Sequence, residues 1–523
     1  MPRSLRVQEI YRLTAGRDDK SDAIELPPNK FQELKNVITI RDSIHKRGGY
    51  AKEYTTALNS GADTQRIHQY EDNSQNLRNI YAIGGNLFRD AMDDNQPTDI
   101  TGGLTLDATR DALYQFINYD GRVIGTDNVN PIFQIPSITD DAEYIDAGGG
   151  TDIPKKAGCL ALWYGFIIAA DVVEFDNVRY PYRIRWHSPP EVDIWPQDRQ
   201  VDLNRNQKIV SMRVHGEYLI IFQERTMWIA MFNPELGGLI QSEFSFKMLD
   251  PKIGAVGDQC VVQTERGLFW VDRKGIYFMA AGSLTPEYVG KPNETMWANL
   301  NLSRLKYGCG ADLREKNAVV FTLPTGSGQV QNNVAIFLNY EEWARYGITR
   351  HPAFSLWEGS TAQGFNFNSM ADVIISDRDR VIAGGYDGFV YLLDEGTEDN
   401  GQGIESQIKT AYLSPHGRGR EKIWYQMAFD VDMKTTKTVS ITYRIFNDPV
   451  PVTKSITAGN AAAVLGAFTL GTSRLGNDDL GRLRGDLSGR SRYIEIDMTI
   501  GTDEATFALH GILVYYKLGS AYP

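Results

Sequence analysis

Cysteine is scarce in this chain, with only Cys159, Cys260 and Cys309 among 523 residues. Three thiols so far apart form no disulfide framework, and none has the CxxC or Cys/His spacing of a zinc site. Two of them lie in apolar stretches that read as strands. We therefore predict buried, reduced thiols in a protein that is made in a cytosol.

Long apolar runs and an excess of basic charge are lacking as well. The longest apolar run, residues 160–173, is too short to span a bilayer and contains Gly165 and Asp171. No apolar signal core follows Met1, so we expect no secretory signal. The formal net charge of −12 argues against a protein that grips nucleic acid electrostatically. It is compatible with a protein that lets nucleic acid pass without sticking.

Common catalytic motifs are missing too. The seven histidines form no HExxH, HxH or Cys–His set, and the chain has no GxSxG elbow, Walker loop or GxGxxG fingerprint. Asp120, Asp272 and Asp387 lie in turns that contain glycine, where turn chemistry explains an aspartate. We expect no enzyme activity, no cofactor and no metal ion.

The chain does contain many short, β-rich runs that are separated by glycine turns. Residues 260–282 hold three such runs, with turns that end at Gly267 and Gly275, and this pattern is typical of an antiparallel meander. A meander buries too little surface to be stable alone. The same pattern recurs in residues 77–88, 115–125, 160–171, 212–229, 318–338 and 381–393.

Equivalent turns recur at a regular spacing. They fall at Gly121, Gly165, Gly216, Gly267 and Asn317, which are 44, 51, 51 and 50 residues apart. A meander that repeats every 40 to 50 residues predicts a β-propeller, here of six or seven blades. Two stacked β-sandwiches are the alternative.

The predicted organisation is an all-β chain with three parts. Residues 1–30 are polar and form either an extended arm or a disordered tail. Residues 31–400 form the β-propeller, and the turn-rich stretch 394–403 marks its end. Residues 401–523 continue as strands without the meander period, which predicts a C-terminal β-sandwich with a long loop insertion at 459–490.

Basic residues gather in two places and are candidates for binding a phosphate or an acidic partner. Charge that merely solubilises a loop is the alternative. The first group is a possible basic patch at the start of the sandwich, and the second occupies or flanks the insertion, where it could form a docking loop or a gate. The groups are Arg418, Arg420 and Lys422, and Arg474, Arg482, Arg484, Arg490 and Arg492.

Two further sets of side chains have a functional and a structural interpretation. The acidic loop at 394–403, with Asp394, Glu395, Glu398 and Asp399, could hold Ca²⁺, but it lacks the spacing of an EF-hand, so we favour a solvated linker. Tryptophans such as Trp163, Trp228 and Trp270 lie on strand patterns. We expect them in the core rather than as platforms for sugars.

Several motifs occur in a characteristic order. Residues 22–37 read D-A-I-E-L-P-P-N-K-F-Q-E-L-K-N-V, and residues 44–50 read I-H-K-R-G-G-Y. R-W-H-S-P-P-E-V-D-I-W follows at 185–195, E-Y-L-I-I-F-Q-E-R-T-M-W at 217–228, and I-G-A-V-G-D-Q-C-V-V at 253–262. This order resembles the tail nozzle, tail hub or packaged-DNA stabilisation proteins of short-tailed bacteriophages.

The resemblance implies a structural role in the virion tail, with assembly in the host cytoplasm. Six copies would form a ring that closes the DNA channel after packaging and lets the genome pass on ejection. The implied partners are portal and adaptor proteins, tail fibres or spikes, and double-stranded DNA that passes through the lumen without sequence-specific binding. Six copies would carry a formal charge of −72, since each carries −12, and such a wall would repel DNA phosphates.

Two other functions stay open at this point. A carbohydrate-binding or carbohydrate-cleaving propeller would need acids and exposed aromatic side chains that converge on one face. A host-receptor adhesion protein would need a distal tip that touches the cell surface.

Overall fold

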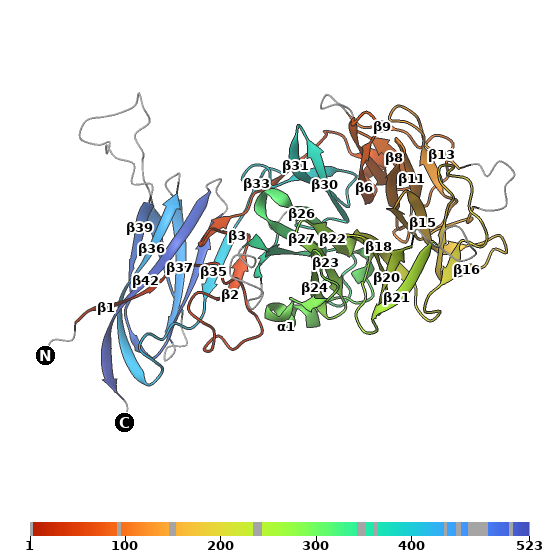
Figure 1. The fold of residues 1–523 in the computed structure, drawn as a ribbon. Helices are drawn as coiled ribbons and strands as arrows, with labels where there is room; N and C mark the ends of the chain where they lie inside the picture. The colour runs from red at the N-terminus through yellow and green to blue at the C-terminus, as the bar shows by residue number, and fades with distance from the viewer. Residues whose placement is uncertain are drawn as a thin grey trace.

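The computed structural model of the chain describes residues 4–90, 96–145, 153–233, 243–341, 352–359, 364–433, 437–445, 451–458, 480–501 and 506–521. These residues form an elongated molecule with a β-propeller at one end and a β-sandwich at the other (Figure 1). No helix in the described ranges is long and apolar enough to cross a membrane.

Seven four-stranded antiparallel blades make up the propeller in the described part of the chain. The first blade contains β6 (Thr64–Glu71), β7 (Leu77–Ile83), β8 (Asn86–Arg89) and β9 (Thr98–Asp99), and the second contains β10 (Gln115–Tyr119), β11 (Arg122–Thr126), β12 (Phe133–Ile135) and β13 (Glu143–Tyr144). The third blade contains β14 (Cys159–Trp163), β15 (Phe166–Val173), β16 (Arg179–Trp186) and β17 (Gln200–Asp202). The fourth contains β18 (Ile209–His215), β19 (Tyr218–Gln223), β20 (Met227–Phe232) and β21 (Phe244–Asp250).

The remaining three blades complete the circle. They are β22 (Val261–Thr264), β23 (Gly267–Asp272), β24 (Gly275–Ala280) and β25 (Glu287–Tyr288); β26 (Cys309–Leu313), β27 (Ala318–Leu323), β28 (Val334–Asn339) and β29 (Ala353–Trp357); and β30 (Ser369–Ile375), β31 (Arg378–Gly384), β32 (Val390–Leu393) and β5 (Tyr50–Lys52). Strand β5 precedes the first blade in sequence and pairs with β32 of the last, which closes the ring.

Packing between the blades explains why the strands are so apolar. The innermost strands β6, β10, β14, β18, β22, β26 and β30 contact one another in a closed circle. Seven separate clusters of buried apolar side chains fill the contacts between successive blades. Strands β23 and β27 are buried along their whole length, so they read as continuous apolar runs rather than as alternating ones.

The five turns expected from the sequence are all present, between the first and second strands of blades two to six. Gly121, Gly165, Gly216 and Gly267 have φ of +67°, +77°, +61° and +138°, and Asn317 has +49°. Glycine and asparagine adopt this left-handed backbone at the least cost. The repeat therefore reflects a turn conformation, and the predicted propeller is confirmed with seven blades.

Two sheets pack against each other to form the sandwich, and one apolar core lies between them. A seven-stranded sheet contains β1 (Arg6–Ile10), β3 (Val37–Ile40), β4 (Ser43–Lys46), β36 (Arg420–Met433), β39 (Leu480–Asp486), β40 (Arg490–Ser491) and β42 (Phe507–Ala521). The facing layer contains β2 (Phe31–Lys35), β35 (Ser406–Thr410), β37 (Lys437–Ile445), β38 (Val452–Ala458) and β41 (Ile494–Ile500).

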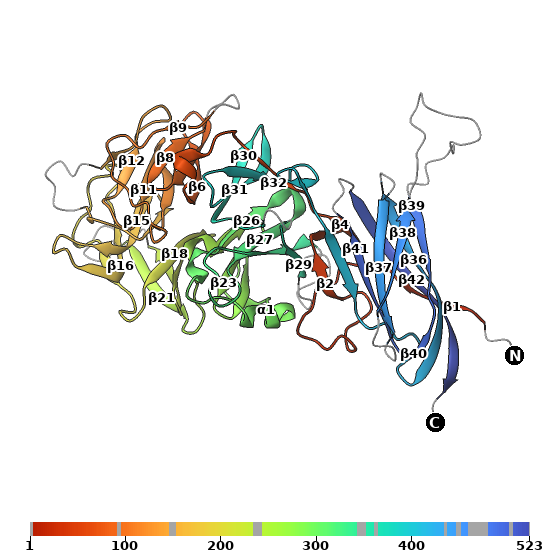
Figure 2. The same ribbon diagram turned by 180° about the vertical axis from the view of Figure 1, so that it is seen from behind.

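This facing layer continues into the propeller. Strand β2 pairs in parallel with β29 of the sixth blade, so nine strands form one sheet across both domains. Two very short strands, β33 (Glu398–Asp399) and β34 (Gln402–Gly403), lie where the chain returns to the sandwich. Seen from behind, β1 and β42 lie side by side at the end of the molecule farthest from the propeller (Figure 2).

The domain boundaries differ from the expected ones at the N-terminal side. Strands β2, β3 and β4 lie within the predicted propeller range 31–400 but belong to the sandwich sheets, because Phe31, Val37 and Ile44 lie in the sandwich core. The propeller is thus inserted between two halves of the sandwich. Residues 6–10 of the predicted arm form β1 and pair with β42.

The predicted loop insertion also needs a correction at its C-terminal end. Residues 480–486 form β39, which pairs along β36, and residues 490–491 form β40 on the same strand. Residues 459–479 lie outside the described ranges, and Arg474 is among them.

Candidate functional site on the propeller axis

The innermost strands of all seven blades line a cavity of about 680 Å³ on the propeller axis. Ligand pockets in proteins commonly have volumes of roughly 300–1,000 Å³, with mostly apolar walls and a few converging polar groups. The apolar walls come from side chains of every blade except the sixth, which contributes Gly310. They include Phe116, Leu160, Leu162, Val214, Val262 and Met370.

A shared carboxylate bridges strands of two non-adjacent blades. The Asp258 carboxylate lies in the short 3₁₀ turn before β22 and accepts from Arg66 Nη1 of β6 at 2.9 Å and from Arg213 Nη1 of β18 at 2.8 Å. Ser211 Oγ donates to the same carboxylate at 2.7 Å. Burial alone would raise the pKa of Asp258, but the charges of Arg213 and Arg66 hold it at about 2. Arg66–Asp258–Arg213, which we call the axial bridge, is therefore ionised at neutral pH.

Acidic side chains lie along the same cavity at the other ends of the inner strands. Glu265 follows β22, and Asp372 lies on β30, where burial raises the pKa of its carboxyl group. Arg314, which follows β26, pairs with Asp372 at 3.2 Å and with Asp379 at 3.1 Å. Asp312 lies beside them, and burial raises its pKa to about 7.

Histidine contributes a neutral group to the cavity. His68 Nε2 forms a 2.9 Å hydrogen bond with Asn118 Oδ1, and burial lowers the pKa of the imidazole to about 4. His215 lies within hydrogen-bond distance of the carbonyls of Ala280 and Ser283, as expected of a satisfied histidine. Within the described ranges, no three His, Cys, Asp or Glu side chains come together in a way that could hold a metal ion.

Tryptophans and turn aspartates behave as the sequence suggested. Trp163 and Trp270 are buried, and Trp228 packs against a buried cluster. Asp272 accepts from the backbone N–H groups of Gly254 and Lys274, and Asp387 accepts from the backbone N–H of Phe389. These aspartates hold turns together.

The first basic group does not form one exposed patch. Arg418 and Arg420 are exposed, but Lys422 is fully buried in β36. Its Nζ donates to Ser414 Oγ and to the carbonyls of Gly417 and Arg492 at 2.7–3.0 Å. Burial first, and then the charge of Arg492, lower its pKa to about 8. The predicted patch is therefore wrong for Lys422, which is a structural residue.

The second basic group divides between two places on the sandwich. Arg490 and Arg492 lie next to the first group, because β40 pairs with β36 at Ile423 and Lys422. Arg482 pairs instead with Asp430 at 2.7 Å across β39 and β36, and Arg484 is exposed on β39. The two groups are thus partly contiguous in space, although about 70 residues separate them in sequence.

The acidic loop is not a solvated linker, which corrects the favoured interpretation. The Asp399 side chain is fully buried and forms a bidentate ion pair with Arg47 at 2.7 and 2.6 Å. Asp394 pairs with Lys316 at 3.2 Å, and Glu395 with Arg380 at 3.6 Å. Three of the four acids thus neutralise cations of the same chain.

Arg47 uses every N–H of its guanidinium at this junction between the domains. It donates to Asn36 Oδ1, to the carbonyls of Gly48 and Glu358, and twice to Asp399. Its guanidinium carbon also lies 5.0 Å from the ring centre of Phe365. The two glycines that follow have no room for a side chain, since a Cβ at Gly49 would lie 1.8 Å from the carbonyl oxygen of Glu398.

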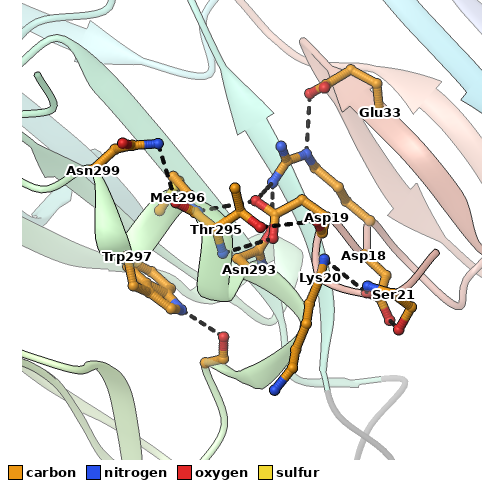
Figure 3. A network of polar contacts seen from close by, with 12 residues as sticks. Asp18, Asp19, Lys20, Ser21, Glu33, Asn293, Thr295, Met296, Trp297 and Asn299 are labelled. Atoms are coloured by element: carbon orange, nitrogen blue, oxygen red, sulfur yellow. Dashed lines mark hydrogen bonds and ion pairs between the residues drawn. The ribbon is translucent and has the colours of Figure 1, made fainter. Parts of the chain in front are cut away.

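The N-terminal segment docks on the propeller of its own chain. Asp19 accepts from the backbone N–H groups of Thr295 and Met296 in the short helix α1 (Glu294–Ala298), each at 3.2 Å (Figure 3). Arg17 Nη1 donates to Asp19 and to Asn293 Oδ1 at 3.0 and 2.6 Å. Residues 17–19 therefore strap the sandwich to the fifth blade instead of forming a free tail.

Sequence reasoning missed the axial bridge, although one signal for it exists. Arg66-Ile67-His68 on β6 and Arg213-Val214-His215 on β18 share the pattern arginine, β-branched residue, histidine on two inner strands. Arginine within an apolar strand needs a partner, since an unpaired buried charge is costly. Two such arginines predict a shared acid, and Asp258 is that acid.

Comparisons with known proteins give a likeness of fold alone. No protein-family model matches the chain, and no curated protein matches it in sequence. Among solved structures, YCF48 from Cyanidioschyzon merolae has a TM-score of 0.36 at 10% identity, over 66% of this chain and 98% of its own. An ancestral GH74 enzyme has a TM-score of 0.31 at 9% identity, over 70% of this chain and 50% of its own. Such low values carry no argument about activity, and the propeller rests on the sheet topology above.

Proposed function

We propose that the chain is a structural, ring-forming component of the tail of a short-tailed bacteriophage. In that role, copies of the chain surround the DNA channel, retain the packaged genome and let it pass on ejection. The motif order of residues 22–37 and 44–50 supports this role, as do the acidic net charge and the inserted propeller. Portal, adaptor and fibre proteins are the proposed neighbours.

The observation that carries the proposal is an open strand edge on the sandwich. Within the described residues, β1 pairs with β42 alone, so its other edge has no strand beside it. Leu5, Val7 and Tyr11 next to or on this strand are 54%, 40% and 45% exposed. An unpaired edge strand that exposes an apolar side chain such as Val7 favours pairing with another chain, and proteins cover such edges unless they use them.

The axial bridge favours a DNA channel between several copies of the chain rather than a channel through the axis of a single propeller. Arg66, Asp258 and Arg213 tie strands of the first and fourth blades to the start of the fifth, which leaves no open axis for a DNA duplex. A channel for DNA would therefore lie between copies, with each propeller as a solid wall.

Native mass spectrometry of the purified chain tests the proposal. We expect a closed ring of six copies, and we expect Val7→Asp to shift it to single subunits, because a carboxylate on the open edge opposes pairing. Val178→Asp is the matched control, since Val178 is 48% exposed on the propeller. Single subunits at every concentration, and no binding to portal–adaptor complexes, would contradict the proposal.

A carbohydrate-binding or carbohydrate-cleaving propeller is the second candidate. One observation favours it: Glu265 and Asp372 line the same axial cavity, and glycosidases commonly use two acidic side chains in one site. A glycan array and an assay for released reducing ends test it. Binding or cleavage that Asp372→Asn abolishes would favour this candidate over the ring.

A further inference from the structure

The axial cavity meets the cationic side of the axial bridge. Arg66 and Arg213 both line the cavity of about 680 Å³. Asp258, the carboxylate they share, lines two smaller cavities of about 20 and 230 Å³ instead. Arg66 also lines the smaller of these two cavities, beside Asp258, whereas the acid itself does not line the large cavity. The two arginines are therefore the members of the axial bridge that border the large cavity.

The bridge leaves one positive charge and several donors without a protein partner. Among the described residues, Arg66 donates to Asp258 alone, and Arg213 donates through Nη1 and Nη2 to Met212 and Asp258. A guanidinium has five N–H donors, so each arginine has donors to spare. Burial and the charge of Arg213 lower the pKa of Arg66, and a further anion would oppose both effects.

The rest of the cavity carries two acidic side chains, Asp372 and Glu265, at its other end. Asp372 is paired with Arg314, and His68 is neutral at physiological pH. Phe116, Leu162 and Met370 supply apolar walls between these groups and the arginines. The volume exceeds what a bare inorganic ion needs and suits an organic molecule with an apolar body.

We propose that the axial cavity binds a small organic acid, whose carboxylate or phosphate group is held by Arg66 and Arg213 while its apolar body lies against the walls of the inner strands. Paired guanidiniums suit this chemistry, because their planar forks match the geometry of oxyanions. The inference does not depend on the ring role.

Isothermal titration calorimetry of the full chain with three matched probes tests the inference. Benzoate and phenyl phosphate carry the two oxyanions on one apolar ring, and benzyl alcohol carries the same ring without a charge. We expect at least one of the anions to bind and benzyl alcohol to bind at least about tenfold more weakly. The comparison between the two anions shows which oxyanion the site takes, and it needs no variant.

Two substitutions locate the binding site. Arg66→Met leaves Asp258 with Arg213 and Ser211, so we expect the variant to fold and to bind the anion at least about tenfold more weakly. Arg213→Met should have a similar effect. Arg205→Met is the control, because Arg205 is 73% exposed, does not line the cavity, and contacts only Asp202 and the ring of Tyr182 among the interactions of the described residues.

Three results would overturn the inference. They are no binding of either anion at about 10 mM, equal binding of benzyl alcohol, or affinities that neither Arg66→Met nor Arg213→Met changes. Should both variants fail to fold, the wild-type comparison of charged and uncharged probes still decides.

Discussion

Replacing Arg47 by methionine should destabilise the junction between propeller and sandwich more than any exposed substitution. The side chains of Arg47 and Asp399 are both fully buried, and the carboxylate accepts two of the five hydrogen bonds that Arg47 donates. Removing one member of a buried ion pair leaves an uncompensated charge and costs about 3–5 kcal/mol. We expect a loss of this size in the free energy of unfolding for Arg47→Met.

Urea unfolding followed by tryptophan fluorescence measures this loss. Trp357 is a suitable reporter, because its ring centre lies 5.7 Å from the guanidinium carbon of Arg47. The double variant Arg47→Met/Asp399→Leu should be more stable than Arg47→Met alone, since an apolar pair of similar volume leaves no buried charge. That recovery separates the ionic effect from lost packing.

An exposed pair provides the control for this experiment. Arg205→Met breaks the pair with Asp202 at a side chain that is 73% exposed, and we expect a change below about 1 kcal/mol. If Arg47→Met costs no more than Arg205→Met, or if the double variant is less stable than Arg47→Met, the junction is not held by the buried pair.

Three further predictions concern packing and pH. Gly49→Ala should lower the yield of folded chain, since the new Cβ would lie 1.8 Å from the Glu398 carbonyl oxygen. Gly419→Ala is the control and should fold, because no atom lies within 4 Å of its Cβ position. Equal yields of the two folded variants would contradict this prediction. Burial lowers the pKa of Lys422 from 10.5 to about 8, so the unfolded state binds more protons between these values and stability should rise with pH there. Lys422→Met should flatten that rise in urea midpoints measured against pH. Burial raises the pKa of Asp312 from 3.8 to about 7, so its contribution to stability should fall as pH rises through this range. An unchanged pH profile in Asp312→Asn would refute it.

Local turn chemistry made the propeller readable from the sequence. Each blade has a turn between its first and second strands. The residue types at Gly165 and Asn317 are enough to predict a left-handed backbone there. The strands between such turns are apolar because neighbouring blades bury them. Both signals are local in the chain, so a single sequence contains them.

Pairing between distant segments could not be read in the same way. Phe31–Lys35 has no local feature that assigns it to a strand more than 370 residues later, yet it pairs with Ser406–Thr410. The burial of Lys422 could not be predicted for the same reason. A lysine in a strand is expected to be exposed, and the carbonyl groups that accept from Lys422 become known only from the structure. The sequence gives no sign that Arg47 is buried, because its partner Asp399 lies in a stretch whose composition is typical of a linker.

The inserted propeller has a consequence for how the chain is made. Strands β2, β3 and β4 leave the ribosome early, but β35, the partner of β2, and β42, the partner of β4, are synthesised only after all seven blades. The propeller can close on its own once β32 meets β5, whereas the first sandwich strands must wait with unpaired edges for several hundred residues. At roughly 5–20 residues per second this delay lasts tens of seconds. Synthesis therefore exposes the N-terminal strands to other nascent copies before their own chain can cover them.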